Sequence, residues 1–388
     1  MEFAKRMDYF KPGIFSVLAD MKHKKTAEGT KVVDLSVGTP NIPPAQHIID
    51  ALVKSAQNGK NYVYALGDTP DLQKAVSAWY KRRYGVDIDP ETEMTSLLGS
   101  QDGLSHIALT IVNPGDIVLV PDPCYPIFGD GPLLAAAKLY RMPLKKENDY
   151  IIDLKAIPED IARKAKFMVV SYPNNPVASI ATPSFYRELV AFAKKYDIIV
   201  LHDNAYSELV FDGKECGSFL EYEGAKDIGV EFNSLSKTYG LAGARIGFAL
   251  GNKQVISQLK SLKSNMDYGM FLPIQAAAVA ALTGPQDCVE TTRRAYENRR
   301  NLLCDGLSSI GWKVEKPAAT MFVWAKIPPK FQSSEKFTFE LLDKAGVLVT
   351  PGSAFGPSGE GYVRMALVQN EDEMNSVINA IDKSRILK

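Results

Sequence analysis

The 388-residue sequence contains little cysteine and little histidine, four of each, and no excess of charge, with 45 basic and 45 acidic residues. No CxxC pair occurs, which disfavours a disulfide framework or a zinc site, and the histidines lack the spacing of metal ligands. We therefore expect no metal and a reducing compartment. A chain without net charge does not attract polyanions in general, so we expect no nucleic-acid partner.

Long apolar runs are also absent. No stretch approaches the ~18 apolar residues of a membrane span, and the first residues, MEFAKRMDYFKPGIF, lack the apolar core and cleavage site of a signal peptide. We expect a cytoplasmic protein without a membrane partner. The patterns GxGxxG, GxxxxGK[ST], GxSxG and HExxH are missing, so the common dinucleotide, P-loop, hydrolase and zinc-peptidase hypotheses lose their main support.

The sequence does have the composition of an ordinary globular protein, with 46% hydrophobic and 23% charged residues. Its length is typical of about two or three domains. We predict an N-terminal arm over 1–45 that forms part of the small domain, a large domain over 46–284 and a small C-terminal domain over 285–388.

Short β-rich runs alternate with helical patterns after residue 90, which is typical of an α/β domain with a mostly parallel sheet covered by helices. Thr182 and Pro183 begin an amphipathic run to Tyr196 and predict a capped helix. Strands are predicted near 94–98, 116–120, 166–172, 197–202, 229–235 and 244–250, with helical spacing over 104–112. Outside this region we predict a strand at 31–37, helices over 286–309 and from Glu371, and strands near 312–315, 321–325, 346–350 and 362–367.

Polar side chains follow several of these strands, at the ends where α/β sheets place their ligands. Lys237 stands among serines, and Arg245 follows eight residues later. An amine, a carboxylate, hydrogen-bond donors and phosphate ligands are together what pyridoxal phosphate requires. The groups that meet these needs are Ser100, Tyr125, Asn175, Asp203, Tyr206, Ser234, Ser236, Lys237 and Arg245. His202, beside Asp203, is a candidate for a hydrogen bond near the site.

In these runs the sequence resembles the fold type I, class I/II pyridoxal-phosphate-dependent aminotransferases over essentially its whole length. VLVPDPCYP, YPNNP, HDNAYSELVFDG and KSNMDYG are most similar to the LL-diaminopimelate aminotransferases. The resemblance implies a large domain with a mostly parallel sheet and a smaller α+β domain. It also implies a ping-pong, Schiff-base reaction in which an amino acid donates its amine and a 2-oxo acid such as 2-oxoglutarate accepts it.

The resemblance assigns roles to the cofactor groups. Lys237 is the Schiff-base lysine and the acid–base catalyst, and Asp203 pairs with the pyridinium. Asn175 and Tyr206 contact the ring oxygen, and Tyr125 stacks on the ring. The residues that hold the phosphate are Ser100, Gln101, Ser234, Ser236 and Arg245.

Substrate and partner contacts follow from the same resemblance. Gly38, Asn175 and Arg364 hold the α-carboxylate, for which a bidentate arginine is well suited. Asn265 holds the far end of a long zwitterionic donor. Tyr64, or Tyr62 in another register, reaches the phosphate of a neighbouring subunit, which implies a homodimer with shared active sites.

Two alternatives to an aminotransferase stay open at this point. One is another enzyme that uses the same cofactor, a C–S lyase or a decarboxylase. The other is a non-catalytic sensor with the same fold. Lys237, Asp203 and Arg364 occur together, which favours an enzyme.

Overall fold

The structure is a computed structural model that describes residues 1–10 and 14–388. Seven strands form its central sheet, in the order β2-β8-β7-β6-β5-β3-β4. All are parallel except β8, which runs antiparallel to both neighbours. Their bounds are β2 Met94–Leu97, β3 Ile117–Asp122, β4 Lys138–Pro143, β5 Ala165–Ser171, β6 Ile199–Asp203, β7 Gly229–Ser234 and β8 Gly247–Gly251. The prediction of a mostly parallel sheet is confirmed, although β4 at its edge was not predicted.

Helices cover both faces of this sheet, which explains why its inner strands are apolar almost without interruption. One face packs on α2 (Gln46–Ala56), α3 (Pro70–Tyr84), α8 (Pro183–Tyr196) and α12 (Leu272–Thr283). The other packs on α4 (Ser100–His106), α5 (Ala108–Ile111), α6 (Ile127–Leu134) and α11 (Lys253–Met266). Short helices α7 (Glu159–Ala162), α9 (Ala225–Ile228) and α10 (Leu235–Thr238) complete this part of the chain.

Local signals determine several helix ends. Thr182 caps α8 by accepting from the Phe185 backbone N–H, and Pro183 occupies the first helical position, as predicted. The predicted helix over 104–112 begins earlier, at Ser100, and divides at Ile107 into α4 and α5. Val112 is already extended.

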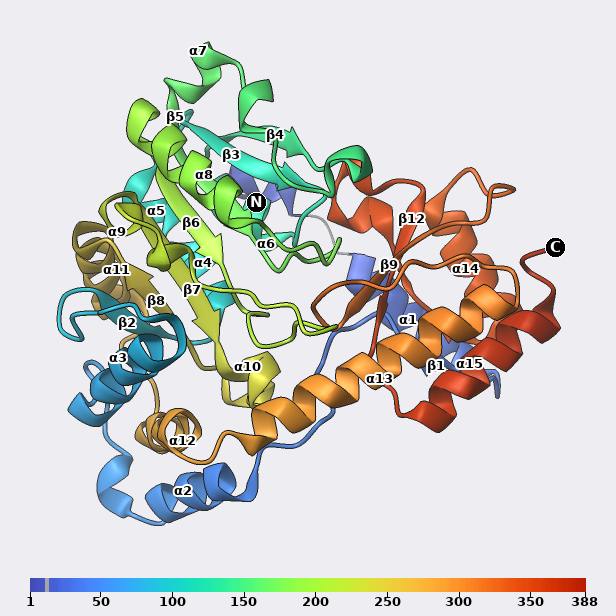
Figure 1. The fold of residues 1–388 in the computed structure, drawn as a ribbon, viewed down its shortest axis with the longest axis horizontal. Helices are drawn as coiled ribbons and strands as arrows, with labels where there is room; N and C mark the ends of the chain where they lie inside the picture. The colour runs from blue at the N-terminus through green and yellow to red at the C-terminus, as the bar shows by residue number, and fades with distance from the viewer. Residues whose placement is uncertain (11–13) are drawn as a thin grey trace.

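The C-terminal part packs around a second core, and the N-terminal segment joins it (Figure 1). The elements are α1 (Ile14–Ala27), β1 (Val33–Asp34), α13 (Asp287–Ser309), β9 (Phe322–Lys326), α14 (Ser334–Ala345), β10 (Val347–Leu348), β11 (Thr350–Pro351), β12 (Tyr362–Ala366) and α15 (Glu371–Ser384). The N-terminal β1 pairs with β10, while β11, β12 and β9 form a three-stranded sheet. The limits of the three domains stay a prediction.

Three strand predictions in this part need correction. Residues 312–315 form no strand, because the Trp312 indole N–H donates to the Lys326 carbonyl at 2.8 Å and the segment makes no ladder. The strand predicted over 346–350 is divided between two sheets on either side of Val349. Only Val33 and Asp34 of the predicted strand 31–37 are paired.

No helix within the described residues, 1–10 and 14–388, is both long and apolar enough to cross a membrane.

Gly247 begins β8 where this strand passes the turn before α4. An added Cβ would lie 2.7 Å from the Asn233 carbonyl oxygen and 2.8 Å from the Ser100 backbone nitrogen. Gly247→Ala should therefore lower the free energy of unfolding by about 1 to 3 kcal/mol, as overpacking does. Denaturant unfolding measures this. Gly243→Ala is the matched control, because its Cβ would meet nothing within 4 Å. Equal unfolding curves for the two variants would contradict the packing described.

Candidate active site

A cavity of about 300 Å³ lies at the carboxyl ends of the parallel strands, where they face β9 and β12. Residues from both parts of the chain line it. They are Val37, Gly38, Gly99, Ser100, Gln101, Tyr125, Asn175, Asp203, Ala205, Tyr206, Ser234, Ser236, Lys237, Ala242, Arg245, Phe322 and Arg364. Most of the predicted site residues therefore converge on one cavity.

Lys237 lies in α10, the short helix that follows β7. Its Nζ donates to the Gly38 carbonyl oxygen at 2.8 Å, across a sequence separation of 199 residues. Burial, with Arg364 and Arg245 nearby, lowers the pKa of Lys237 to about 8, while Asp203 opposes the shift. With this pKa about a tenth of the amine is uncharged at pH 7, and that fraction grows as the pH rises. The uncharged form is the one that acts as a nucleophile and proton acceptor.

Asp203 ends β6 as a buried carboxylate. Burial raises the pKa of Asp203 to about 6, and the Ala205 backbone N–H, which donates to it at 3.3 Å, opposes that shift. A buried carboxylate at the cavity favours a cationic partner in contact with it. Tyr206 lines the same cavity, and burial raises the pKa of its phenol, which therefore stays protonated.

Arg364 of β12 is only 2% exposed. Its Nη1 donates to Asn175 Oδ1 at 3.0 Å and its Nη2 to the Ser36 carbonyl at 2.8 Å. The guanidinium also lies 4.1 Å from the centre of the Phe322 ring. Burial lowers the pKa of Arg364 to about 10, which still leaves the group charged at neutral pH. These contacts hold a cation in one orientation beside the cavity.

Gly38 permits this arrangement because it has no side chain. A Cβ at that position would lie 2.5 Å from the Phe322 ring, so any larger residue would displace the ring that supports Arg364. Tyr125 is held by Gln101, because its hydroxyl donates to Gln101 Oε1 at 2.9 Å.

The end of the cavity away from Arg364 is rich in hydrogen-bond donors. Gly99, with φ of +82°, turns the chain into α4, and a Cβ there would lie 2.5 Å from Arg245 Nη2. Arg245 itself donates to the carbonyls of Ala242 and Leu98 at 3.1 and 3.2 Å. The hydroxyl-bearing residues at this end are Ser100, Ser234 and Ser236. Serine hydroxyls beside a guanidinium are suited to a phosphate group.

Three predicted residues lie outside the cavity. Tyr64 is 84% exposed and its ring lies 5.8 Å from that of Tyr268. Tyr62, the alternative to Tyr64, contacts Phe271 in the same way. Asn265, near the end of α11, is exposed and donates to the Ser261 carbonyl at 2.9 Å. The roles given to these residues stay predictions.

His202 also points away from the cavity. It precedes Asp203 in β6, and successive side chains of a strand face opposite sides of the sheet. Its ring nitrogens contact Glu231 and Tyr186 in the buried layer beneath.

Sequence reasoning missed several residues of the cavity wall, chiefly Phe322, Val37 and Ala242. The strand that contains Phe322 was predicted, but Phe322 and Trp324 share one face of that strand. The sequence does not show which of these two rings lies at a cavity. Val37 and Ala242 are small apolar residues in irregular segments and carry no signal of their own.

The chemistry of these donors fits pyridoxal phosphate. One buried carboxylate, one amine of lowered pKa and a phenol occupy the middle of the cavity. Hydroxyls and Arg245 lie at one end, and Arg364 at the other. Lys237, Asp203, Tyr206, Asn175 and Tyr125 would surround the ring in this arrangement, with the serines around the phosphate.

Comparison with known proteins agrees with this chemistry. The family model for aminotransferase class I and II matches residues 30–381. The chain is 44% identical over 382 residues to the LL-diaminopimelate aminotransferase of Moorella thermoacetica, with 98% of each chain covered. It is 42% identical to that of Halothermothrix orenii, covering 100% of this chain and 99% of the other.

Solved structures share the whole fold. Substrate-bound BacF of Bacillus subtilis superposes with a TM-score of 0.96 at 38% identity and covers 99% of this chain and 98% of its own. A variant of the Thermus thermophilus aspartate aminotransferase reaches a TM-score of 0.93 at 25% identity, covering 99% and 100%. The chain therefore belongs to the class I and II aminotransferases, pyridoxal-phosphate-dependent enzymes that transfer an amino group from an amino acid to a 2-oxo acid.

Proposed function

We propose that this aminotransferase acts as a homodimer with shared active sites on LL-diaminopimelate or a related polar amino acid, with 2-oxoglutarate as the acceptor. The observation that carries the amino-transfer chemistry is the buried Arg364, held by Asn175 and Ser36 in the same cavity as Lys237. The names of the curated relatives, at 42 to 44% identity, support the donor.

The residue roles follow from this arrangement. Bound in the cavity, pyridoxal phosphate supplies an aldehyde and an electron-withdrawing ring. Arg364, with Asn175 beside it, binds the α-carboxylate of the donor, and Gly38 leaves room for it. Lys237 Nζ accepts the proton from the α-carbon and returns it during transfer, which its lowered pKa allows. Asp203 holds a proton at the ring nitrogen.

Lys237→Ala should reduce turnover by more than the ~10⁴-fold typical of a lost acid–base group, since the nucleophilic amine is lost as well. Cofactor should still bind through the phosphate ligands. The measurement is turnover together with intact mass after borohydride reduction, in which wild type retains the cofactor covalently and the variant does not. Lys253→Ala, an exposed lysine at the start of α11, is the control. Covalent label on the Lys237→Ala variant would refute the assignment.

Asp203→Asn should make the cofactor-free protein more stable at pH 8. Because burial raises the pKa of Asp203 from 3.8 to about 6, the folded chain binds this proton more tightly than the unfolded chain. The stability from this group is present below about pH 4 and is lost as the pH rises through about 6. The variant should therefore gain about 2 to 3 kcal/mol at pH 8 and very little at pH 4, by denaturant unfolding. A gain that is the same at both pH values would contradict the cause.

The dimer rests on an exposed apolar surface. Tyr64 and Leu66 are 84% and 77% exposed, although such large side chains usually lose most contact with water. The aromatic surface consists of Tyr62, Val63, Tyr64, Leu66, Tyr268 and Phe271. Contiguous apolar patches of this kind mark interaction sites. Asn265 lies three residues before Tyr268, so a second copy placed on this surface would bring both Tyr64 and Asn265 to its neighbour.

Sharing of sites is tested by mixing two weakened variants. In a mixed dimer of Lys237→Ala and Tyr64→Ala chains, one site carries both changes and the other carries neither. With random pairing, about a quarter of wild-type activity should return, because half of the dimers are mixed and each has one intact site. Each variant measured alone should show little or no activity. If exchange of subunits is confirmed by mass and no activity returns, Tyr64 does not act across the interface.

The choice of amino-acid donor depends on the end of the substrate that lies away from the α-carboxylate. Among the cavity-lining residues of the described chain, the cations are Lys237, Arg245 and Arg364, and each has a role above. The distal charges of a long donor are therefore left to the second copy, where Asn265 is the candidate. A donor panel should give the highest kcat/KM for LL-diaminopimelate or glutamate rather than leucine or valine.

Asn265→Ala should lower kcat/KM at least about tenfold for the long polar donors, the cost of about one charge-assisted hydrogen bond, and leave leucine nearly unchanged. Gln258→Ala, at an exposed position of α11, is the control, because Ser264 already accepts from the Asn265 amide at 3.3 Å. A panel led by leucine or valine, or an equal loss for every donor, would overturn the proposed donor class.

A further inference from the structure

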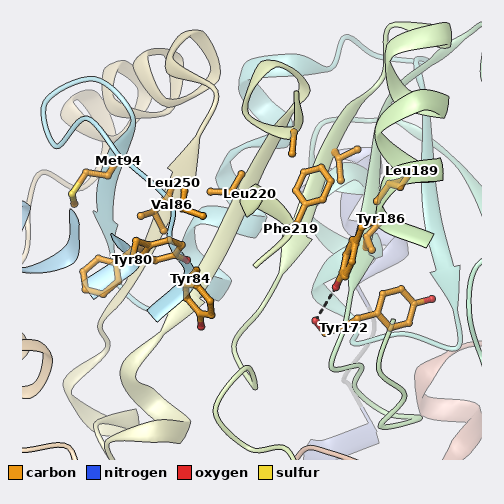
Figure 2. Close-up of a cluster of buried hydrophobic side chains, with 14 of the residues drawn as sticks. Tyr80, Tyr84, Val86, Met94, Tyr172, Tyr186, Leu189, Phe219, Leu220 and Leu250 are labelled. Carbon is orange, nitrogen blue, oxygen red and sulfur yellow. Dashed lines mark hydrogen bonds between the residues drawn. The ribbon is translucent and has the colours of Figure 1, made fainter. Parts of the chain in front are cut away.

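A histidine and a glutamate are buried side by side beneath the cavity, on the opposite face of the central sheet. His202 of β6 and Glu231 of β7 are both 0% exposed, and His202 Nδ1 lies 3.0 Å from Glu231 Oε2. The strand register places these two residues directly side by side. They lie in a layer of aromatic residues between the sheet and α3 and α8, where Figure 2 shows Tyr80, Tyr84, Tyr186 and Phe219. The cavity chemistry described above uses neither residue.

Glu231 has four hydrogen-bond donors around it. The Phe219 backbone N–H donates to Oε2 at 2.8 Å, and the Ser218 hydroxyl donates to Oε1 at 2.8 Å. The Tyr80 hydroxyl donates to Oε1 at 2.9 Å. With His202 as the fourth, these donors occupy the acceptor sites of an ionised carboxylate and leave no position for a proton. Glu231 is therefore an anion without access to water.

A buried anion needs a cation beside it, because a charge isolated in a medium of low dielectric is strongly unfavourable. His202 is placed to be that cation. Its Nε2 lies 3.1 Å from the Tyr186 hydroxyl. This hydroxyl donates to the Tyr172 carbonyl at 3.4 Å, drawn as the dashed line in Figure 2, so its oxygen is able to accept from His202. Both ring nitrogens then act as donors, the pattern of an imidazolium.

The pair is next to Asp203 along the chain. His202 and Asp203 are successive residues of β6 and point to opposite faces, so the imidazolium lies directly behind the carboxylate of the cavity. A positive charge at His202 lowers the pKa of Asp203 and counteracts burial, while Glu231 acts weakly in the other direction. The pair therefore reaches the cavity through charge as well as through the position of the strand.

We propose that His202 and Glu231 are positioning residues, which hold Asp203 at the end of β6 and keep its carboxylate ionised from behind the sheet. The proposal rests on the role given to Asp203 above. It assigns His202 the direct effect and Glu231 the task of keeping His202 charged. Several ionisable groups face the pair on its own side of the sheet, while Asp203 lies on the other side. They are Tyr80 and Tyr84 from α3, Tyr186 from α8, and Cys216 and Glu221 from the segment before β7.

The test measures the dissociation constant of pyridoxal phosphate against pH, by fluorescence titration of the full chain with the cofactor after dialysis has removed the bound cofactor. In wild type, the affinity for pyridoxal phosphate should fall at low pH as Asp203 takes up a proton. This falling part of the pH profile is the acid limb. His202→Gln removes the cation and keeps the anion, so the acid limb should move to higher pH, with affinity about tenfold weaker near pH 6 and within twofold of wild type at pH 8.5. Glu231→Gln removes both charges and should move the limb less than His202→Gln does.

Tyr186→Phe and Tyr172→Phe are a milder matched pair, useful if the charge variants do not fold. Tyr186→Phe removes the acceptor of His202 Nε2 and should move the limb in the same direction by a smaller amount. Tyr172→Phe removes a buried hydroxyl that bonds the Ile152 backbone in the same layer. It should lower the melting temperature and leave the limb where it is.

The outcomes separate a role in positioning Asp203 from a purely structural role of the pair. A loss of stability or of affinity that is equal at every pH, in both His202→Gln and Tyr186→Phe, would show a purely structural pair and overturn the proposal. If Asp203→Asn retains the wild-type acid limb, the fault lies in the role given to Asp203 and not in the pair. A shift in the order His202→Gln, then Glu231→Gln, then Tyr172→Phe with none, supports the proposal.

Discussion

The cavity confines three basic side chains with a single carboxylate, and the packing around it depends on this imbalance. Burial lowers the pKa values of Lys237 and Arg364 and raises that of Asp203, and all three shifts have the loss of water as their first cause. An excess of positive charge suits a phosphate ester and a carboxylic acid, which together bring more negative charge than Asp203 supplies. The contacts of Arg364 with Asn175, Ser36 and Phe322 hold its guanidinium in one place beside the cavity.

The loss of water on burial affects charged groups on both faces of the sheet. Asp203 faces the cavity and His202 faces the aromatic layer, so one strand carries an acid and a base on opposite sides. Glu231 then completes a row in which each buried charge has an opposite charge nearby, which limits the cost of placing ionisable groups in a core. Parallel strands make this possible, because β6 and β7 bring His202 and Glu231 into register without a turn between them.

Much of the sheet and half of the site could be predicted from the sequence. In a parallel sheet the strand ends gather at one edge, so Asp203, Ser234 and Lys237 are expected to converge whatever the strand order. The edge strand β4 was missed because its exposed, polar pattern does not resemble a buried strand. Residues 312–315 alternate like a strand, but the Trp312 indole bonds β9 in place of a backbone ladder.

The other half of the site depends on contacts across most of the chain. Arg364 donates to the carbonyl of Ser36, 328 residues earlier, and Lys237 donates to Gly38. Motif matching suggests that these residues belong together, yet only the pairing of β1 with β10 and of β12 with β9 places them at one cavity. Phe322 shows the limit most clearly, since its role comes from lying between Gly38 and Arg364 and not from its own chemistry.

A buried ion cluster connects the phosphate end of the cavity with the aromatic surface. Lys263 of α11 lies 2.6 Å from Asp102 and 2.9 Å from Asp267, and Asp102 also accepts from the Leu98 backbone N–H. Arg245 binds the Leu98 carbonyl from the other side, so the turn into α4 is held at both of its backbone groups. Asp267 adjoins Tyr268 of the aromatic surface. A second copy on that surface would exclude water from Asp267, whose side chain is 21% exposed, and ion pairs attract more strongly as the local dielectric falls. Dimer formation would then stiffen the turn that presents Ser100, in addition to supplying Tyr64.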